Sequence, residues 1–308
     1  MRTIWKSAYS KKVELGVDPG SQLVEILLWG VATGCVYILL ATGLNIIFGV
    51  MKLVNFAHGE LLMIGAYVSY TVTVALGLNA YAGVLAAMGV VAVIGIGVER
   101  FCFRKVMGTE KLNEIIISLG LIYVFTNAAI LLWGDKSKKI VSPFENLVVP
   151  VTGSAFINYD RIIAMVIVAV ILVGLFLFIK KTKMGLAMRA TSQRSDTSML
   201  MGINVNRVYM FSFALGAALA GAAGGLYGII FTFNPQIGAL PTIKAFAIII
   251  LGGLGSIPGA VIGGLLYGIA EYSASTFLGG IWPDAVAFAV LIAVLVVRPT
   301  GLFGQKGE

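Results

Sequence analysis

Few side chains capable of chemistry interrupt the apolar stretches of this 308-residue sequence. His58, the single histidine, stands two residues before Glu60 in a polar break at 55–60, and Ser256 belongs to a glycine-rich break at 251–258 in the second half. A histidine base with a serine nucleophile would be the parts of a hydrolase that acts inside a membrane. One histidine and one Gly-Ser pair are a weak basis for that interpretation.

The same polar breaks also fit a transport path. Apolar segments interrupted at corresponding positions in two halves of a chain point to broken helices around a permeation path. The competing interpretation places His58 and Glu60 in a loop at the membrane surface, because a charge deep in hydrocarbon costs roughly 3 kcal/mol on insertion scales. The candidates for the path are Asn55, His58, Glu60, Gly253, Ser256 and Glu271, with Asn45 added on the same reasoning.

Composition places the chain in a membrane. Hydrophobic residues make up 59% of it and charged residues only 12%, whereas soluble domains carry about a quarter charged residues. The mean hydropathy is +0.97. The formal charge of +8 comes from basic residues at the ends of apolar segments, so nucleic acid is not expected as a partner. The two cysteines, Cys35 and Cys102, provide neither a disulfide framework nor a metal site.

Long charge-free runs predict the membrane spans. The first covers residues 26–51, which exceeds the roughly 20 residues that a helix needs to cross hydrocarbon. The sequence shows no alternation typical of a β-barrel, so the spans are helices. The expected fold is an all-α polytopic membrane protein of eight or nine transmembrane helices, depending on whether 245–254 crosses, with broken or re-entrant helices in two pseudo-repeated halves. The other spans are expected within 60–99 (two, with a hinge at 77–79), 115–134, 162–179, 208–243 (with breaks at 234–235 and Pro241), 244–271 and 281–297.

One transmembrane domain is expected over residues 25–304, between a basic N-terminal tail or interfacial helix at 1–24 and a short tail at 305–308. Prolines and glycines in the polar loop 135–161 predict a compact non-helical excursion. The polar loop 180–208 holds six of the 22 Lys and Arg residues, which predicts that it is cytoplasmic and that 135–161 is extracytoplasmic. Glycines at four-residue spacing in the second half predict close helix packing.

The loop 180–208 contains a short helix suited to a partner. Ser195 or Asp196 can cap its start, residues 197–201 form its body, and Gly202 can adopt the left-handed conformation that ends it. The alternative is a basic loop that only anchors the chain on the inner side. Three adjacent apolar residues would form a surface for contact with another protein: Met199, Leu200 and Met201.

Several motifs, in order along the chain, carry a resemblance to a known family. They are N-F-A-H-G-E at 55–60, G-L-A-M-R-A at 185–190, G-I-N-V-N-R-V at 202–208, K-A-F at 244–246, L-G-G-L-G-S-I-P-G-A at 251–260 and R-P-T-G-L-F-G at 298–304. Together they resemble the permease subunits of branched-chain amino-acid ABC importers, of the LivH type, over about residues 25–304. The chain departs from the wider importer pattern, which has an E-A-A triplet and a later I-x-L-P, so coupling residues are carried over only from the narrower family.

The resemblance implies a transport subunit, not an enzyme, in the inner membrane of a prokaryote, forming half of a path for leucine, isoleucine and valine. Its implied partners are a homologous second permease, two cytoplasmic ATPase subunits, an extracytoplasmic substrate-binding protein and membrane lipid. No cofactor is expected on this chain. ATP and Mg²⁺ would bind the ATPase subunits, because the sequence has no Gly-Lys dipeptide and hence no P-loop. The residues expected to couple to the ATPases are Gly185, Arg189, Ala190, Arg194, Met199, Leu200, Met201 and Gly202.

Other transport functions stay open at this point. An importer of urea or short amides has a closely similar architecture, and substrate choice rests largely on the external binding protein. An ion-coupled carrier or a passive channel would need an ionisable relay within the bundle, and the charge-free spans supply almost none.

Overall fold

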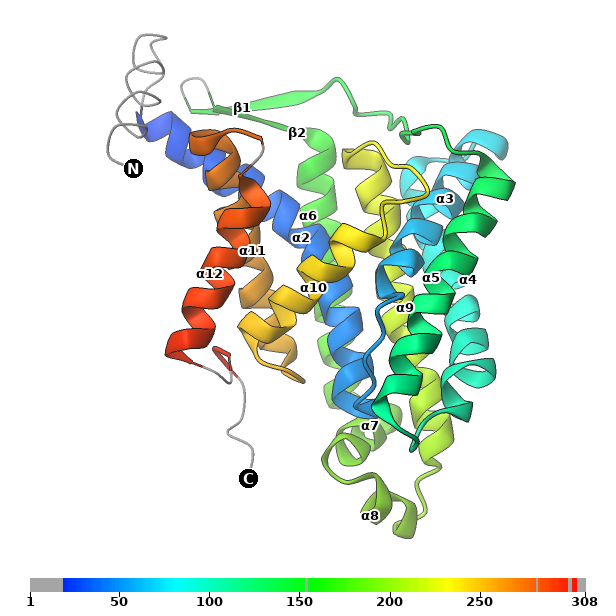
Figure 1. The fold of residues 1–308 in the computed structure, drawn as a ribbon. Coiled ribbons are helices and arrows are strands. Elements are labelled where there is room, and N and C mark those ends of the chain that lie inside the picture. The colour runs from blue at the N-terminus through cyan, green and yellow to red at the C-terminus, as the bar shows by residue number, and fades with distance from the viewer. Residues whose placement is uncertain (1–18, 153–154, 281, 299–300, 304–308) are drawn as a thin grey trace.

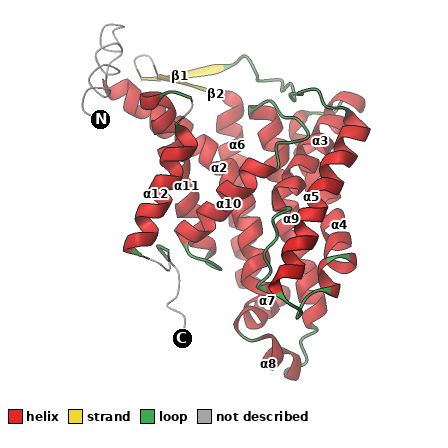
Figure 2. Cartoon of the chain, in the orientation of Figure 1, coloured by secondary structure: helices red, strands yellow, loops and turns green. Residues whose placement is uncertain are grey.

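The computed structural model describes residues 19–152, 155–280, 282–298 and 301–303. Within them the chain is a bundle of helices with one short antiparallel β-hairpin, so the all-helical expectation is confirmed. In chain order the elements are α2 (Pro19–Met51), α3 (His58–Ala75), α4 (Ala80–Phe101), η1 (Phe103–Lys105), α5 (Lys111–Trp133), β1 (Val148–Thr152), β2 (Ala155–Asn158), α6 (Tyr159–Lys181), α7 (Lys183–Gln193), α8 (Ser195–Leu200), α9 (Val205–Ile230), α10 (Ala239–Gly252), α11 (Ile257–Leu278) and α12 (Pro283–Val297). Figure 2 shows how little of the described chain is strand, and Figure 1 shows the hairpin and the α7–α8 pair at opposite ends of the bundle.

Five of the described helices are long and apolar enough to cross a membrane: α2, α4 with η1, α5, α6 and α9. α10 and α11 form a sixth candidate only as a pair, because they are bent by 117° at the break between them. α3 has only 18 residues and opens with the polar side chains of His58 and Glu60, while α12 has 15 residues. The chain is a multi-pass membrane protein, with five or six candidate spans among the described helices by length and composition.

The polar stretch 180–208 is mostly helix, which differs from the expected loop. α6 continues to Lys181, α7 and α8 fill most of the remainder, and α9 begins at Val205. The Thr182 hydroxyl accepts a hydrogen bond from Gly185 N at 3.0 Å, which is the N-cap arrangement that starts a helix. α7 was not predicted, because so polar a segment between two apolar spans was interpreted as a loop.

The N-terminal boundary also differs from the expectation. α2 begins at Pro19 and continues without interruption to Met51, so residues 19–24 belong to this long helix and not to the tail. Residues 1–18, where the tail or interfacial helix was expected, lie outside the described residues, and so does the expected tail at 305–308.

Small residues bring the central helices into close contact. α9 packs against α2, α3 and α4, and α2 packs against α11. A Cβ at Gly224 of α9 would overlap the carbonyl oxygen of Leu62 in α3, and one at Gly268 of α11 would overlap the carbonyl oxygen of Gly30 in α2. Close backbone packing of this kind drives helix association where lipid removes the hydrophobic drive. The predicted packing role of these glycines is confirmed.

Three predicted breaks are present in the bundle. Residues 52–57 run back into the bundle after α2, so that α3 begins in its interior (Figure 1). α9 ends at Ile230, before the break predicted at 234–235, and α10 ends at Gly252 within the break predicted at 251–258. Pro241 is different, because it lies in the first turn of α10, where a missing backbone N–H removes no intrahelical hydrogen bond.

Candidate functional site

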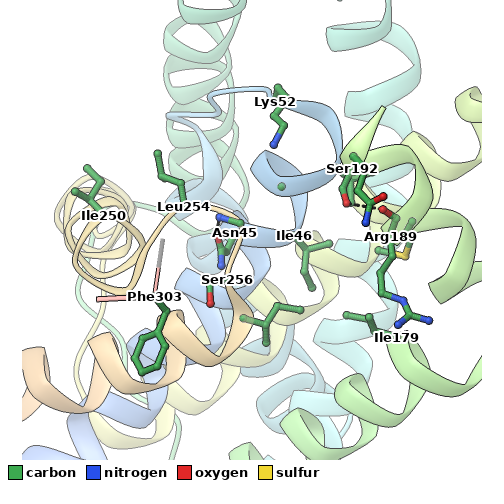
Figure 3. Close-up of a pocket in the computed structure, with 16 residues that line it drawn as sticks. Asn45, Ile46, Lys52, Ile179, Arg189, Ser192, Ile250, Leu254, Ser256 and Phe303 are labelled. Atoms are coloured by element: carbon green, nitrogen blue, oxygen red, sulfur yellow. Dashed lines mark hydrogen bonds between the residues drawn. The ribbon is translucent and has the colours of Figure 1, made fainter. Parts of the chain in front are cut away.

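A cavity of about 830 Å³ opens between the end of α2, the helix α7 and the turn that joins α10 to α11. Figure 3 shows Arg189 and Ser192 of α7 on one side, and Asn45, Leu254 and Ser256 on the other. The cavity thus combines residues from the predicted coupling segment with residues from the predicted glycine-rich break. It is the place where those two predictions meet in space.

Glycines and two polar side chains shape the α10–α11 turn. Gly253 and Gly255 have φ angles of 102° and 82°, which L side chains rarely adopt. Ser256 caps the start of α11, because its hydroxyl accepts a hydrogen bond from Gly259 N at 3.1 Å. Asn45 of α2 reaches the turn from outside, and its Oδ1 accepts a hydrogen bond from Gly255 N at 2.7 Å. The turn is therefore fixed to α2 as well as to its own helices.

α7 is attached closely to the end of α6. A Cβ at Gly185 would overlap the carbonyl oxygen of Ile179, so only glycine allows α7 to fold back at this point. Met188 and Thr191 on the next turns are buried. Arg189 is the coupling candidate that lines the cavity. The carbonyl oxygen of Ala190, another such candidate, accepts a hydrogen bond from Arg194 N at 3.3 Å, where α7 ends.

α8 projects from the end of the bundle and exposes its apolar side chains. The exposed fractions of Met199, Leu200 and Met201 are 54%, 88% and 79%. Gly202 N donates to Met199 O at 3.0 Å and Ile203 N donates to Ser198 O at 3.1 Å. This pair of hydrogen bonds is the Schellman motif, with glycine at its left-handed position.

The predicted end of this helix is confirmed, since Gly202 has a φ of 81°. The predicted start is wrong by one or two residues. Arg194 is the N-cap, with no side-chain hydrogen bond to the helix, and Ser195 and Asp196 lie within its first turn. Asp196 there still favours the helix, because a negative charge complements the positive end of the helix dipole.

Asn55, His58 and Glu60 lie where α3 begins, and all three side chains are buried. His58 Nε2 lies 3.2 Å from the carbonyl oxygen of Leu40 in α2. The Glu60 carboxylate accepts a hydrogen bond from Thr126 Oγ1 in α5 at 3.2 Å. These contacts place the motif inside the bundle rather than in an exposed surface loop.

The same end of α3 is seated on the start of α10. Gly59 N donates to Thr242 Oγ1 at 2.9 Å, and a Cβ at Gly59 would overlap the carbonyl oxygen of Gly238. The polar break at 55–60 is therefore in contact with the start of α10 through a glycine and a threonine. Thr242 was not among the sequence candidates, because a threonine near the start of an apolar helix carries no distinctive signal.

Glu271 belongs to a cluster of three charges and one tyrosine hydroxyl, contributed by four helices and called here the charge cluster. Lys244 Nζ of α10 lies 2.9 Å from Glu271 Oε1 of α11 and 2.8 Å from Asp284 Oδ1 of α12. It also donates to the Tyr37 hydroxyl of α2 at 3.3 Å. The Lys244 and Glu271 side chains are 8% and 16% exposed, and buried charges are tolerated when they are paired in this way. Sequence reasoning missed the cluster, although an isolated lysine and aspartate next to apolar runs were a usable signal.

The structure sorts the path candidates into three places. Asn45 and Ser256 line the cavity, with Gly253 in the same turn. Asn55, His58 and Glu60 join α3 to its neighbours, and Glu271 lies in the charge cluster. Ser256 acts as a helix cap and His58 contacts Leu40, so no described hydrogen bond makes a His–Ser pair. Within the described residues there is also no group of three or more His, Cys, Asp or Glu that could hold a metal.

The buried polar break before α3, the α10–α11 pair bent by 117° and the projecting α7–α8 pair define a polytopic helical membrane protein with interrupted helices. The model of the family described as "branched-chain amino acid transport system / permease component" matches residues 26–295, and the chain belongs to this family. The resemblance found in the motifs is therefore confirmed.

Relatives align with nearly the whole chain. BraD of Pseudomonas aeruginosa, a high-affinity branched-chain amino acid transport system permease protein, is 36% identical over 294 residues, which are 92% of this chain and 96% of BraD. LivH of Escherichia coli K12, a permease of the same description, is 36% identical over 288 residues, or 90% and 94% of the two chains. The solved structure of PsaBC from Streptococcus pneumoniae in complex with Fab aligns with a TM-score of 0.50 over 90% of this chain and 94% of that one. Its sequence identity is 14%, so this likeness concerns the fold alone.

Proposed function

We propose that this chain is the transmembrane permease subunit of an ATP-driven importer for the branched-chain amino acids leucine, isoleucine and valine. The permease names and full-length alignment of BraD and LivH support the substrate class. The observation that carries the proposal is α8, a helix of six residues that holds Leu200 88% exposed at the end of the bundle. An apolar side chain held outside both the core and the spans fits a docking surface for another protein.

Coupling would run from α8 through α7 into the cavity. α8 would enter a groove of a cytoplasmic ATPase subunit, with Met199, Leu200 and Met201 in contact with it. Arg194 joins α8 to α7, and Gly185 seats α7 directly against the end of α6. A displacement of α8 is then passed on to Arg189, which lines the cavity.

This assignment fixes the sides of the membrane. If α7 and α8 are cytoplasmic, the β-hairpin and the start of α2 are extracytoplasmic and the end of α12 is cytoplasmic (Figure 1). The described helices α2–α6 and α9–α12 then make nine passes, of which those by α3 and α10 are partial. The region 25–304 forms one permease domain, with the coupling segment 180–208 inside and the loop 135–161 outside.

The packing supports two pseudo-repeated units, α2–α3–α4 and α9–α10–α11. In each, a long helix is followed by an interruption and then by a short helix with one end in the interior (Figure 1). α9 packs against α3 and α4 of the first unit, while α2 packs against α10 and α11 of the second. This exchange of partners is what two intertwined repeats would produce, and interrupted helices in two repeats are the elements that line transport paths.

We assign the cavity to the cytoplasmic end of the path, with Asn45 and Ser256 on its wall and Gly253 in the turn that carries Ser256. His58, Glu60 and Asn55 hold α3 where it meets α10, and Glu271 anchors α10 through Lys244. A second permease would close the path from the other side, and an extracytoplasmic binding protein would deliver the amino acid. ATP and Mg²⁺ would bind only to the ATPase subunits.

Leu200→Asp tests the proposal. Burial of a leucine side chain contributes about 1.5–3 kcal/mol, so we expect the variant to bind the ATPase subunits about ten- to a hundredfold more weakly. Pull-down of those subunits and substrate-stimulated ATP hydrolysis in the reconstituted complex measure the effect. Leu147→Asp is the matched control, because Leu147 is 49% exposed in the loop at the opposite end.

Full assembly and full stimulation with Leu200→Asp would refute the docking role of α8. Uptake of labelled leucine and of labelled urea by the same proteoliposomes separates the two substrate classes. Leucine uptake without urea uptake is the expected result, and the reverse would replace the branched-chain assignment by a urea importer.

A further inference from the structure

The last described residues of the chain, 301–303, complete the end of α10. Leu302 N donates to the carbonyl oxygen of Leu251 at 2.9 Å, and Phe303 N donates to that of Gly252 at 3.0 Å. Leu251 and Gly252 are the last two residues of α10, where carbonyl groups have no partner within their own helix. The C-terminal segment therefore supplies, from a distant part of the sequence, hydrogen-bond donors that a helix end needs.

Gly301 makes this close approach possible. Its φ is 78°, and a Cβ at this position would lie 2.5 Å from Ile250 O and 2.7 Å from Gly253 N. Glycine is required both for the backbone conformation and for the lack of space. Gly301 N donates to Arg298 O at 2.9 Å, and Arg298 Nη1 donates to Leu302 O at 3.2 Å, so the end of α12 holds the segment in place.

The α10–α11 turn is thus held from two sides. On one side Asn45 of α2 accepts the hydrogen bond from Gly255 N. On the other side residues 301–303 bind the last carbonyl groups before the turn, and Phe303 lines the cavity beside Leu254 and Ser256 (Figure 3). A turn with two glycines at positive φ has little rigidity of its own, so these outside contacts set its position.

We propose that residues 301–303 are a positioning segment that fixes the α10–α11 turn at the cytoplasmic mouth of the translocation path. The location of that mouth rests on the proposed transport function, whereas the contact itself does not. The segment follows α12 on the same side of the bundle as α7 and α8 (Figure 1). Release of the segment frees the end of α10 and lets the turn move into or out of the cavity.

The sharpest test compares two variants that both lack the Phe303 ring and differ in one backbone hydrogen bond. Phe303→Pro deletes the N–H that binds Gly252 O, and Phe303→Ala is its matched control, which removes the ring but keeps that N–H. The readout is the rate at which a charged thiol reagent labels Leu254→Cys in the assembled complex, with Cys35 and Cys102 replaced by alanine. Loss of one such hydrogen bond should raise the labelling rate about three- to tenfold in Phe303→Pro relative to Phe303→Ala.

A second pair of variants covers the case in which the proline variant does not assemble. Gly301→Ala introduces a Cβ where there is no room, while Gly174→Ala in α6 makes the same change where nothing lies within 4 Å. Labelling of Leu254→Cys should rise in the first and stay unchanged in the second. Ser192→Cys, on the α7 side of the same cavity, should be labelled at the same rate in all variants. A general loosening of the bundle would instead raise its labelling rate as well.

Equal labelling of Leu254→Cys in all four variants would overturn the positioning role. The ratio of ATP hydrolysed to leucine transported is measured in the same complexes and should rise in Phe303→Pro and Gly301→Ala. The labelling rates can be measured and interpreted even in a complex that does not transport leucine. A wild-type complex that assembles but takes up no leucine would therefore count against the proposed function, while its labelling pattern would still judge the positioning segment.

Discussion

The two units α2–α3–α4 and α9–α10–α11 have the same order of parts but differ in how their short helices end. α3 ends at Ala75 and passes through the exposed residues 76–79 to α4, whose start Asn79 caps with a hydrogen bond from Tyr81 N at 2.9 Å. α10 has 14 residues and is bent by 117° from α11. Each connection has a helix cap of its own, Asn79 in the first and Ser256 in the second, but the second is also held by α2 and by residues 301–303.

This difference indicates which connection can move relative to the rest of the bundle. A connection that is stable through its own contacts follows its helices and has little reason to respond to other parts of the chain. The α10–α11 turn depends on Asn45 and on the C-terminal segment, so a shift of either partner changes its position. Interrupted helices are the elements from which transporters build their binding paths. The first unit is then a scaffold, and the second contains the adjustable wall of the cavity.

Breaking the charge cluster should have the largest effect on the second unit. In Lys244→Met, Glu271 is left buried without its cation, and removal of one partner of a buried ion pair costs about 3–5 kcal/mol. We expect a large drop in the melting temperature of the purified protein in detergent. The double variant Lys244→Met/Glu271→Gln should recover part of this loss, since it removes the unpaired charge.

Lys139→Met is the matched control for this experiment. Lys139 pairs with Glu145 in the polar loop, where the two side chains are 38% and 30% exposed, and exposed pairs contribute about 0–1 kcal/mol. A drop no larger than that of Lys139→Met would mean that the charge cluster does not stabilise α10. The small-residue contacts between the two units would then be sufficient to hold them together.

Local signals in the sequence predicted the ends of helices better than the contacts between them. Gly202 was correctly expected to end α8, and the glycines and proline at 251–258 were correctly expected to break a span, because both effects act within a few residues. The partners of Lys244 come from three other helices, and the partners of Leu302 and Phe303 lie some fifty positions earlier in the sequence. Nothing in the spacing of those residues indicates that they meet.

Loss of one asparagine hydrogen bond should have a smaller effect than loss of Lys244, and it compares the two connections directly. Asn45→Ala removes the part-buried hydrogen bond between Gly255 N and Asn45 Oδ1, which costs about 0.5–1.5 kcal/mol. Asn79→Ala makes the same change in the first unit and removes a helix cap, at about 0.5–2 kcal/mol. We expect comparable losses of thermal stability, but reduced leucine transport per ATP hydrolysed only for Asn45→Ala. Equal transport losses would show that the α10–α11 turn is no more sensitive than the α3–α4 connection.

The smallest expected effect comes from replacing either of two glycines that both have a positive φ. Gly77 and Gly255 have φ angles of 64° and 82°, and a Cβ at Gly77 meets nothing within 4 Å, while one at Gly255 meets only Gly49 Cα at 3.9 Å. Alanine at either position is therefore strained by about 1–2 kcal/mol for its left-handed conformation and by little else. The two variants should melt at similar temperatures and assemble equally well with the ATPase subunits. Only Gly255→Ala moves the N–H that binds Asn45 at the wall of the cavity, so only this variant should change the amount of leucine transported per ATP. The two variants are matched in stability, so a difference in transport between them reports on the α10–α11 turn. If Gly77→Ala reduced transport per ATP as much as Gly255→Ala does, the distinction between a scaffold unit and an adjustable wall would be wrong.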